Sequence, residues 1–168
     1  PGEIAKADKI ILPGVGHFQK AMENLTNLKM TDALNEFVLI KKKPILGICL
    51  GMQLMAKNSE EGNVNGLGWF EASVIKFRVK ENLKYKIPHI GWNKVLISKE
   101  NCLMKNIPDL SEFYFIHSYH LTVTDNKDVS GETIYETRFP SAIAKENIFG
   151  VQFHPEKSHT AGSALLKN

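Results

Sequence analysis

The chain has 168 residues, of which 43% are hydrophobic, and a formal net charge of +3 at pH 7. It is long enough to bury one core and contains no apolar run of bilayer length, so we expect a single domain without a membrane span or a secretory signal. The small net charge argues against nucleic-acid binding, and two cysteines are too few for a disulfide framework, which favours a reducing cytoplasm.

The first part of the chain alternates strands and helices. Apolar periodicity predicts a strand over 9–12, helices over 18–28 and 32–42, a buried strand over 45–48 and a short helix over 52–56. From residue 71 onward, turn residues separate short apolar runs, which predict strands over 72–77, 93–97, 113–117, 121–124, 141–144 and 148–153 and a final helix over 161–166. This order predicts an α/β fold of three layers: a largely parallel central sheet with helices on both faces and an antiparallel extension.

Cys49 lies where the strand over 45–48 turns into the following helix. The sequence is Gly47-Ile48-Cys49-Leu50-Gly51, and the two glycines relieve the crowding of so sharp a reversal. At the N-terminus of a helix the macrodipole stabilises a thiolate, and the amide of the next residue points at the oxygen of an attacked carbonyl. We therefore expect Cys49 to be an exposed nucleophile. The alternative for an isolated motif of this kind is a small core residue beside a tight turn.

A histidine and a carboxylate follow the last predicted strand. His154 comes directly after the apolar run 148–153, and Glu156 is two residues further on. Since the carboxyl ends of parallel strands meet in one crevice, His154 is well placed to serve Cys49 as a base. Glu156 can hold the tautomer of the imidazole and stabilise the imidazolium.

Three segments together resemble class I, triad-type glutamine amidotransferases: PGVG at 13–16, GICLGMQ at 47–53 and QFHPEKS at 152–158. Two further segments, PHIGWN at 88–93 and FYFIHSY at 113–119, are similar to the branch formed by the glutaminase subunits of imidazole glycerol phosphate synthases. This resemblance runs from Ile4 to about Leu166.

The resemblance implies a glutaminase that hydrolyses glutamine to glutamate and ammonia, without a cofactor or metal. It assigns Cys49 as nucleophile, His154 as general base and acid, and Glu156 as the residue that orients the imidazole. The implied oxyanion hole consists of the backbone amides of Leu50 and of Val15 or Gly16. The implied substrate-binding residues are Gln53, Ser118 and Tyr119.

The resemblance also implies a partner, a (β/α)8 cyclase bound as a heterodimer. The cyclase receives ammonia through a channel and performs a lyase-type step of histidine biosynthesis that yields imidazole glycerol phosphate and AICAR. Lys157 and Tyr114 align with interface residues near the ammonia exit, and Trp92 and Asn93 belong to the 88–93 loop. For Trp92, covering the core of a small domain is the alternative.

Alternatives to this function follow from other features of the chain. In the resembled family a strand-helix-strand unit precedes the first segment, so we expect 1–168 to be a single domain lacking about thirty to forty residues of that unit. A fragment of this kind could be an interaction module without catalysis. The segment Gly66–Trp69 keeps a third interpretation open, a paralogous glutaminase that supplies ammonia to an amidotransferase of surface-sugar biosynthesis.

Two further expectations concern residues outside the proposed site. His117 and His120 are three residues apart, and on one strand that spacing would point them to opposite faces, which argues against a metal site. Cys102 has no nearby histidine or acid in the sequence, so we expect it to pack in the core.

Overall fold

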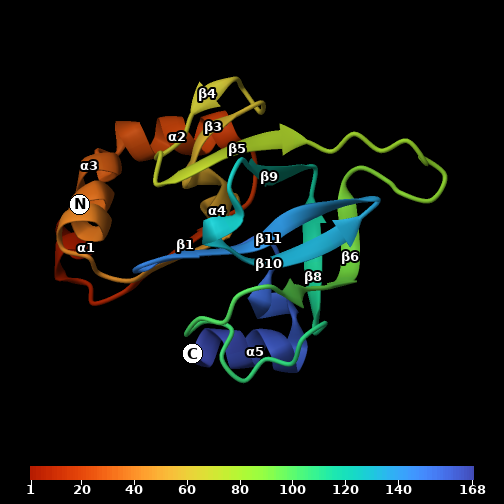
Figure 1. Ribbon diagram of the computed structural model, residues 1–168. Helices are drawn as coiled ribbons and strands as arrows, with labels where there is room; N and C mark the ends of the chain where they lie inside the picture. Colours follow the sequence, from red (N-terminus) through yellow and green to blue (C-terminus); the bar gives the residue numbers. More distant parts are fainter.

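A mixed sheet of six strands forms the centre of the structure (Figure 1). The computed structural model describes residues 1–168. In spatial order the strands are β1 (Ile10–Gly14), β2 (Ile45–Cys49), β12 (Ile148–Val151), β11 (Thr137–Lys145), β10 (Val129–Tyr135) and β7 (Leu96–Ile97). β1, β2 and β12 pair in parallel, and the remaining pairings are antiparallel. The predicted α/β class and its antiparallel extension are confirmed, with the parallel part made of three strands.

Two smaller sheets accompany the central one. One contains β4 (Val64–Asn65), β3 (Ala56–Ser59), β5 (Phe70–Lys76) and β9 (Tyr119–Val123), and the other contains β6 (His89–Lys94) and β8 (Glu112–His117). We call the second of these the β6–β8 ribbon. Between β5 and β6 a long connection extends away from the body of the molecule, at the right of Figure 1. The sequence predicts most of these strands but not their division into separate sheets.

Helices cover both faces of the central sheet, as predicted (Figure 1). The helical elements are α1 (Gly2–Lys6), α2 (Phe18–Asn27), α3 (Met30–Asn35), the π-helical turn η1 (Glu36–Ile40), α4 (Leu50–Leu54), α5 (His159–Lys167) and two 3-10 turns, η2 (Asn126–Asp128) and η3 (Pro155–Lys157). α2 to α4 lie on one face and α5 lies on the other. None of these helices combines the length and apolarity that crossing a membrane requires.

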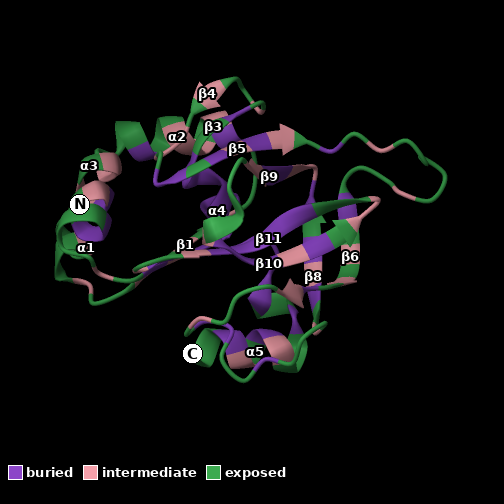
Figure 2. Cartoon of the chain, viewed as in Figure 1, coloured by how far each residue is buried: buried purple, intermediate pink, exposed green.

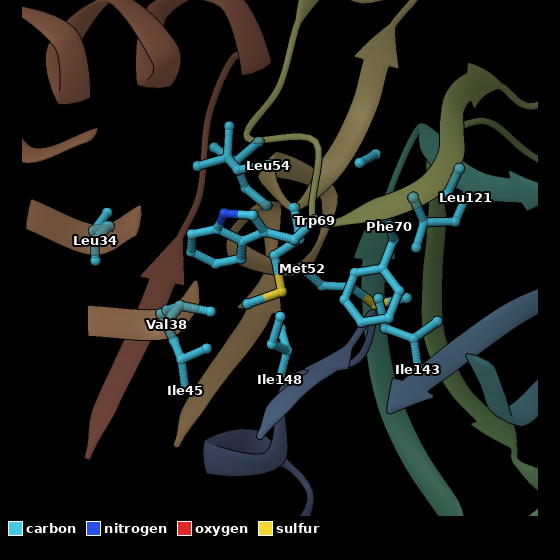
Figure 3. Packing of buried hydrophobic residues seen from close by; sticks show 14 of the residues in the cluster. Leu34, Val38, Ile45, Met52, Leu54, Trp69, Phe70, Leu121, Ile143 and Ile148 are labelled. Atoms are coloured by element: carbon cyan, nitrogen blue, oxygen red, sulfur yellow. The ribbon is translucent and has the colours of Figure 1, made fainter. Parts of the chain in front are cut away.

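The central sheet separates two hydrophobic clusters, because alternate residues of a strand point to opposite faces. Ile45 and Ile148 pack into the cluster beneath α2 to α4, where Met52 and Trp69 also lie (Figure 3). Ile48 and Val151 pack into the other cluster, against α5. Figure 2 shows the buried strands between the more exposed outer surfaces of the helices. β2, which ends at Cys49, therefore contributes to both clusters.

Several predicted boundaries are wrong. The helix expected over 32–42 is divided into α3 and η1, where the Lys41 amide bonds five residues back to the Glu36 carbonyl. The helix expected over 52–56 is α4, which begins at Leu50, because Ala56 already belongs to β3. β3, β4 and β10 are not predicted. In β10, glycine and polar residues interrupt the apolar pattern, and the register comes from pairing with β11.

Candidate active site

Cys49 occupies the sharp turn between β2 and α4 that the sequence predicts. Its backbone has φ 53° and ψ −111°, a strained conformation for a residue with a side chain. The glycines at 47 and 51 permit the turn: a Cβ at Gly51 would lie 1.8 Å from the Leu12 carbonyl oxygen, and one at Gly47 would lie 2.7 Å from the Gly51 carbonyl carbon. β1, β2 and α4 therefore approach one another closely around the cysteine.

The surroundings of the thiol differ from the prediction. Cys49 is only 6% exposed, and its Sγ lies 3.9 Å from the Ile116 carbonyl oxygen, to which the thiol donates. Burial raises the pKa of the thiol to about 11, opposed by the Leu50 backbone amide and the Gln152 side chain, which lower it. The helix N-terminus does not dominate the pKa because α4 has only five residues and the sulfur is desolvated. The thiol is therefore protonated at neutral pH.

His154 and Glu156 form the predicted pair. The Nδ1 of His154 lies 2.7 Å from Oε1 of Glu156, so the carboxylate accepts the Nδ1 proton and fixes the tautomer. The Nε2 atom of His154 is buried and has no hydrogen-bond partner. Cys49 bonds to the Ile116 carbonyl instead, so the sulfur and the imidazole are not hydrogen-bonded to each other.

Ser158, which the sequence analysis does not single out, holds the backbone around His154. Its hydroxyl donates to the His154 carbonyl at 2.6 Å and accepts from the Tyr114 amide at 3.0 Å. The His154 amide in turn donates to the Tyr114 carbonyl at 2.8 Å. A serine within the QFHPEKS segment is the only sequence signal of this role.

A cavity of about 250 Å³ brings most of the predicted site residues together. Its lining includes Cys49 and all the predicted oxyanion and substrate residues, namely Val15, Gly16, Leu50, Gln53, Ser118 and Tyr119. Glu61, Ile116 and His117 complete it, and Glu61 is the only charged residue of the lining. Glu61 is not predicted from the sequence, because a carboxylate in a loop carries no distinctive pattern.

His154 and Glu156 line a different and more open cavity of about 470 Å³. Val15 belongs to the lining of both cavities, so the PGVG loop lies between them. β1 ends at Gly14, which pairs directly with Cys49. The structure thus places the loop beside the nucleophile, and the predicted triad extends across two adjoining cavities.

Gln53 and Gln152 are linked behind the thiol. The Gln53 side-chain nitrogen donates to the Tyr119 carbonyl and to Oε1 of Gln152, both at 2.9 Å. Both protons of this amide are used within the protein, so only the Oε1 atom of Gln53 is left to bind a ligand. Gln152 donates to the Cys49 sulfur at 3.6 Å. Gln152 is fully buried and directly follows β12. A polar residue within the otherwise apolar run 148–153 is the sequence signal for this position.

Two of the predicted interface residues lie on one face of the β6–β8 ribbon, and a third, Lys157 of η3, approaches that face. Trp92 pairs across the strands with Tyr114 and is 45% exposed, so it does not cover the core. The Lys157 ammonium lies 5.8 Å from the centre of the Tyr114 ring. Asn93 lies on the opposite face and donates to the Ile134 carbonyl at 3.0 Å.

The geometric argument about His117 and His120 and the expectation for Cys102 are wrong. His117 and His120 do not point to opposite faces, because a bend at Ser118 places them on different strands; both pack against Phe77, with ring centroids 5.2 and 4.4 Å away. Cys102 is exposed rather than packed in the core.

The fold and this arrangement of residues define a class of protein. The family model of class-I glutamine amidotransferases matches residues 3–168, and the chain belongs to this family. Among its relatives is imidazole glycerol phosphate synthase subunit HisH 2 of Methanococcus maripaludis, which is 50% identical over the whole chain and 82% of its own length. Subunit HisH 1 of Campylobacter jejuni is 48% identical, again over the whole chain and 83% of its own length.

Solved structures share the fold at lower sequence identity. A glutamine amidotransferase from Thermotoga maritima has a TM-score of 0.67 at 22% identity, and the match covers 97% of this chain and 62% of the Thermotoga chain. The glutaminase domain of Trypanosoma brucei CTPS, solved with bound acivicin, has a TM-score of 0.64 at 20% identity, and the match covers 99% of this chain and 74% of that domain. These similarities support the fold class.

Proposed function

We propose that this chain is the glutaminase subunit of an imidazole glycerol phosphate synthase and acts in the cytoplasm in histidine biosynthesis. The observation that carries the proposal is Cys49 on a strained strand-to-helix turn, in a cavity shared with the Leu50 amide and the PGVG loop. The HisH relatives, which match along the whole chain, support the branch.

The proposed reaction is acyl transfer through a thioester. His154 takes the thiol proton at Nε2 while the sulfur of Cys49 attacks the side-chain amide carbon of glutamine. The backbone amide of Leu50 and that of Val15 or Gly16 stabilise the resulting oxyanion. The imidazolium returns its proton to the departing nitrogen, which leaves as ammonia. His154 then deprotonates a water molecule that hydrolyses the thioester, giving glutamate and the free thiol.

The lining of the smaller cavity suits the rest of the glutamine molecule. The Glu61 carboxylate, held by the Phe18 amide at 2.7 Å from its Oε2, offers an acceptor to the α-ammonium group. The remaining oxygen of Gln53 provides another acceptor. Ser118 and Tyr119 complete the proposed binding site for the polar end of the substrate.

The partner is proposed to be a (β/α)8 cyclase that binds the exposed face of the β6–β8 ribbon as a heterodimer and receives ammonia through a channel. Ile116 connects this face to the nucleophile: its side chain is exposed, while its carbonyl accepts from Cys49. Docking that shifts β8 would release the thiol from this carbonyl and allow it to meet the unpartnered Nε2 of His154. The isolated glutaminase is then expected to be nearly inactive.

The segment Gly66–Trp69, which raised the surface-sugar alternative, has a packing role. Trp69 is buried in the cluster beneath α2 to α4, and its Nε1 donates to Asn35 at 2.8 Å. No feature of the site therefore favours that alternative over the cyclase partner.

The test is glutamate release from glutamine, measured for the chain alone and with a histidine-pathway cyclase carrying its nucleotide ligand. Stimulation by the cyclase that disappears in Cys49→Ala and persists in Cys102→Ala is the expected result. Absence of glutamate under both conditions, from protein shown by circular dichroism to be folded, would contradict the proposal and favour an interaction module without catalysis.

A further inference from the structure

A continuous series of hydrogen bonds runs from the β6–β8 ribbon to the sulfur of Cys49. It begins where Asn93 Nδ2 lies 3.4 Å from His89 Nε2, and continues where His89 Nδ1 lies 3.1 Å from His117 Nε2. His117 Nδ1 lies 2.8 Å from the Tyr119 carbonyl oxygen, which also accepts from Gln53. The Gln53 and Gln152 bonds described above complete the path. We call this series the Asn93–Cys49 network.

The two histidines of the network can each donate in only one direction. Both are buried, and burial lowers the pKa of His89 to about 4 and that of His117 to about 3, so both are neutral at neutral pH. A carbonyl oxygen only accepts, so the proton of His117 is on Nδ1 and its Nε2 is an acceptor. The proton of His89 is therefore on Nδ1 as well, and its Nε2 accepts from Asn93.

The hydrogen-bond partners also determine which atom of the Gln152 amide faces the thiol. The Tyr119 carbonyl requires a donor from Gln53, so the nitrogen of Gln53 faces both Tyr119 and Gln152. Gln152 must accept this hydrogen bond with its Oε1 atom, so its N–H groups point toward Cys49. A reversed Gln152 amide would set two donors against each other and would present its oxygen to the sulfur, where it would disfavour a thiolate.

We propose that the part of this network from the Tyr119 carbonyl to Cys49 is an orienting device: the carbonyl fixes the Gln53 amide, and Gln53, the positioning residue, keeps the N–H of Gln152 on the Cys49 sulfur. The inference rests on the proposed role of Cys49 as nucleophile. It adds Gln152 as a residue that touches the reacting atom.

The test follows the reaction of Cys49 with iodoacetamide between pH 8 and pH 11, reached by pH jump. Peptide mass spectrometry separates Cys49 from the exposed Cys102, which is an internal reference. Gln152→Met removes the donor, and Gln53→Met removes the amide that holds Gln152 in this orientation.

In Gln152→Met we expect the Cys49 rate to fall roughly tenfold between pH 8 and pH 10, since losing one hydrogen bond to a charged group is worth about one pKa unit. In Gln53→Met we expect a smaller fall, because the freed Gln152 amide can turn its oxygen toward the sulfur. The Cys102 rate should not change. The rate in wild type should begin to level near pH 11, and in the variants it should still be rising there. A variant that merely alters access to Cys49 would lower the rate without moving the pH at which it levels.

Thr133→Val is the matched control, because it removes a buried hydrogen bond of 2.8 Å to Ser141 that lies outside the network. A Cys49 rate in folded Gln152→Met within twofold of wild type would overturn the proposal, as would an equal fall in Thr133→Val. Should Gln152→Met fail to fold, Gln53→Met replaces it, with the same criterion. The alkylation rate requires no glutaminase activity, so failure of the proposed function is distinguishable from failure of this inference.

Discussion

At the residue scale, the nucleophile turn depends on neighbours that have no side chain. A methyl group at Gly51 would overlap the Leu12 carbonyl, and the backbone of β1 or α4 would have to move. We expect Gly51→Ala to lower the free energy of unfolding by roughly 2–4 kcal/mol, which urea denaturation would measure. Gly2→Ala is the matched control, because a Cβ there meets nothing within 4 Å. Equal stability of the two variants would show that the close approach does not constrain the turn.

Also at the residue scale, the sequence predicts the members of the site better than their chemical state. Cys49, His154 and Glu156 follow from short motifs at strand ends, because a strand that ends in a turn places its side chains predictably. The raised pKa of Cys49 depends on burial by residues from distant strands, which no local pattern encodes. Gln152 and Ser158 escape prediction for the same reason, since their roles are defined by partners on other elements.

At the scale of elements, the buried histidines make stability depend on pH. His89 on β6 and His117 on β8 have pKa values lowered to about 4 and about 3 by burial, from an ordinary value of 6.5. Below pH 6.5 these histidines are therefore protonated in the unfolded chain but still neutral in the folded protein. The contribution of the neutral histidines to stability is complete above pH 6.5 and is lost as the pH falls. The free energy of unfolding should decrease by about 1.4 kcal/mol per pH unit for each histidine.

Urea denaturation at pH 7.5, 6.5 and 5.5 measures this slope. His89→Phe should reduce the change in unfolding free energy per pH unit by the contribution of one histidine, and Thr133→Val should leave this change as in wild type. A wild-type stability that does not change between pH 6.5 and 5.5 would contradict the prediction.

The elements themselves were predictable to different degrees. β2, α2 and α5 follow from apolar runs of the right period, which local burial enforces. The ribbon of β6 and β8 and the second sheet were not predictable as separate sheets, because the choice of strand partner is made between segments far apart in the chain. β10 shows the same limit, since its register comes from β11 rather than from its own sequence.

At the scale of the whole molecule, the exposed face of the ribbon should determine partner binding. Trp92 is stacked on His159, with ring centroids 4.9 Å apart, and is neighbour to Tyr114, so it is a preorganised aromatic anchor. We expect Trp92→Ala to weaken binding to the cyclase about 30-fold or more, measured by isothermal titration calorimetry. Leu39→Ala, at a similarly exposed apolar residue in η1, should bind as wild type. Equal affinities of the two variants would place the interface elsewhere.

The division of the interior into two clusters has a consequence for how this enzyme tolerates change. β2 is shared by both clusters: Ile45 packs into one, Ile48 packs into the other, and Cys49 lies at the end of the strand. Because close-packed interiors transmit strain, a change in side-chain volume in either cluster should shift β2 and, with it, the Cys49 thiol. Substitutions deep in either half, without any contact with glutamine, should therefore change turnover, and pairs that compensate each other across the sheet should restore it.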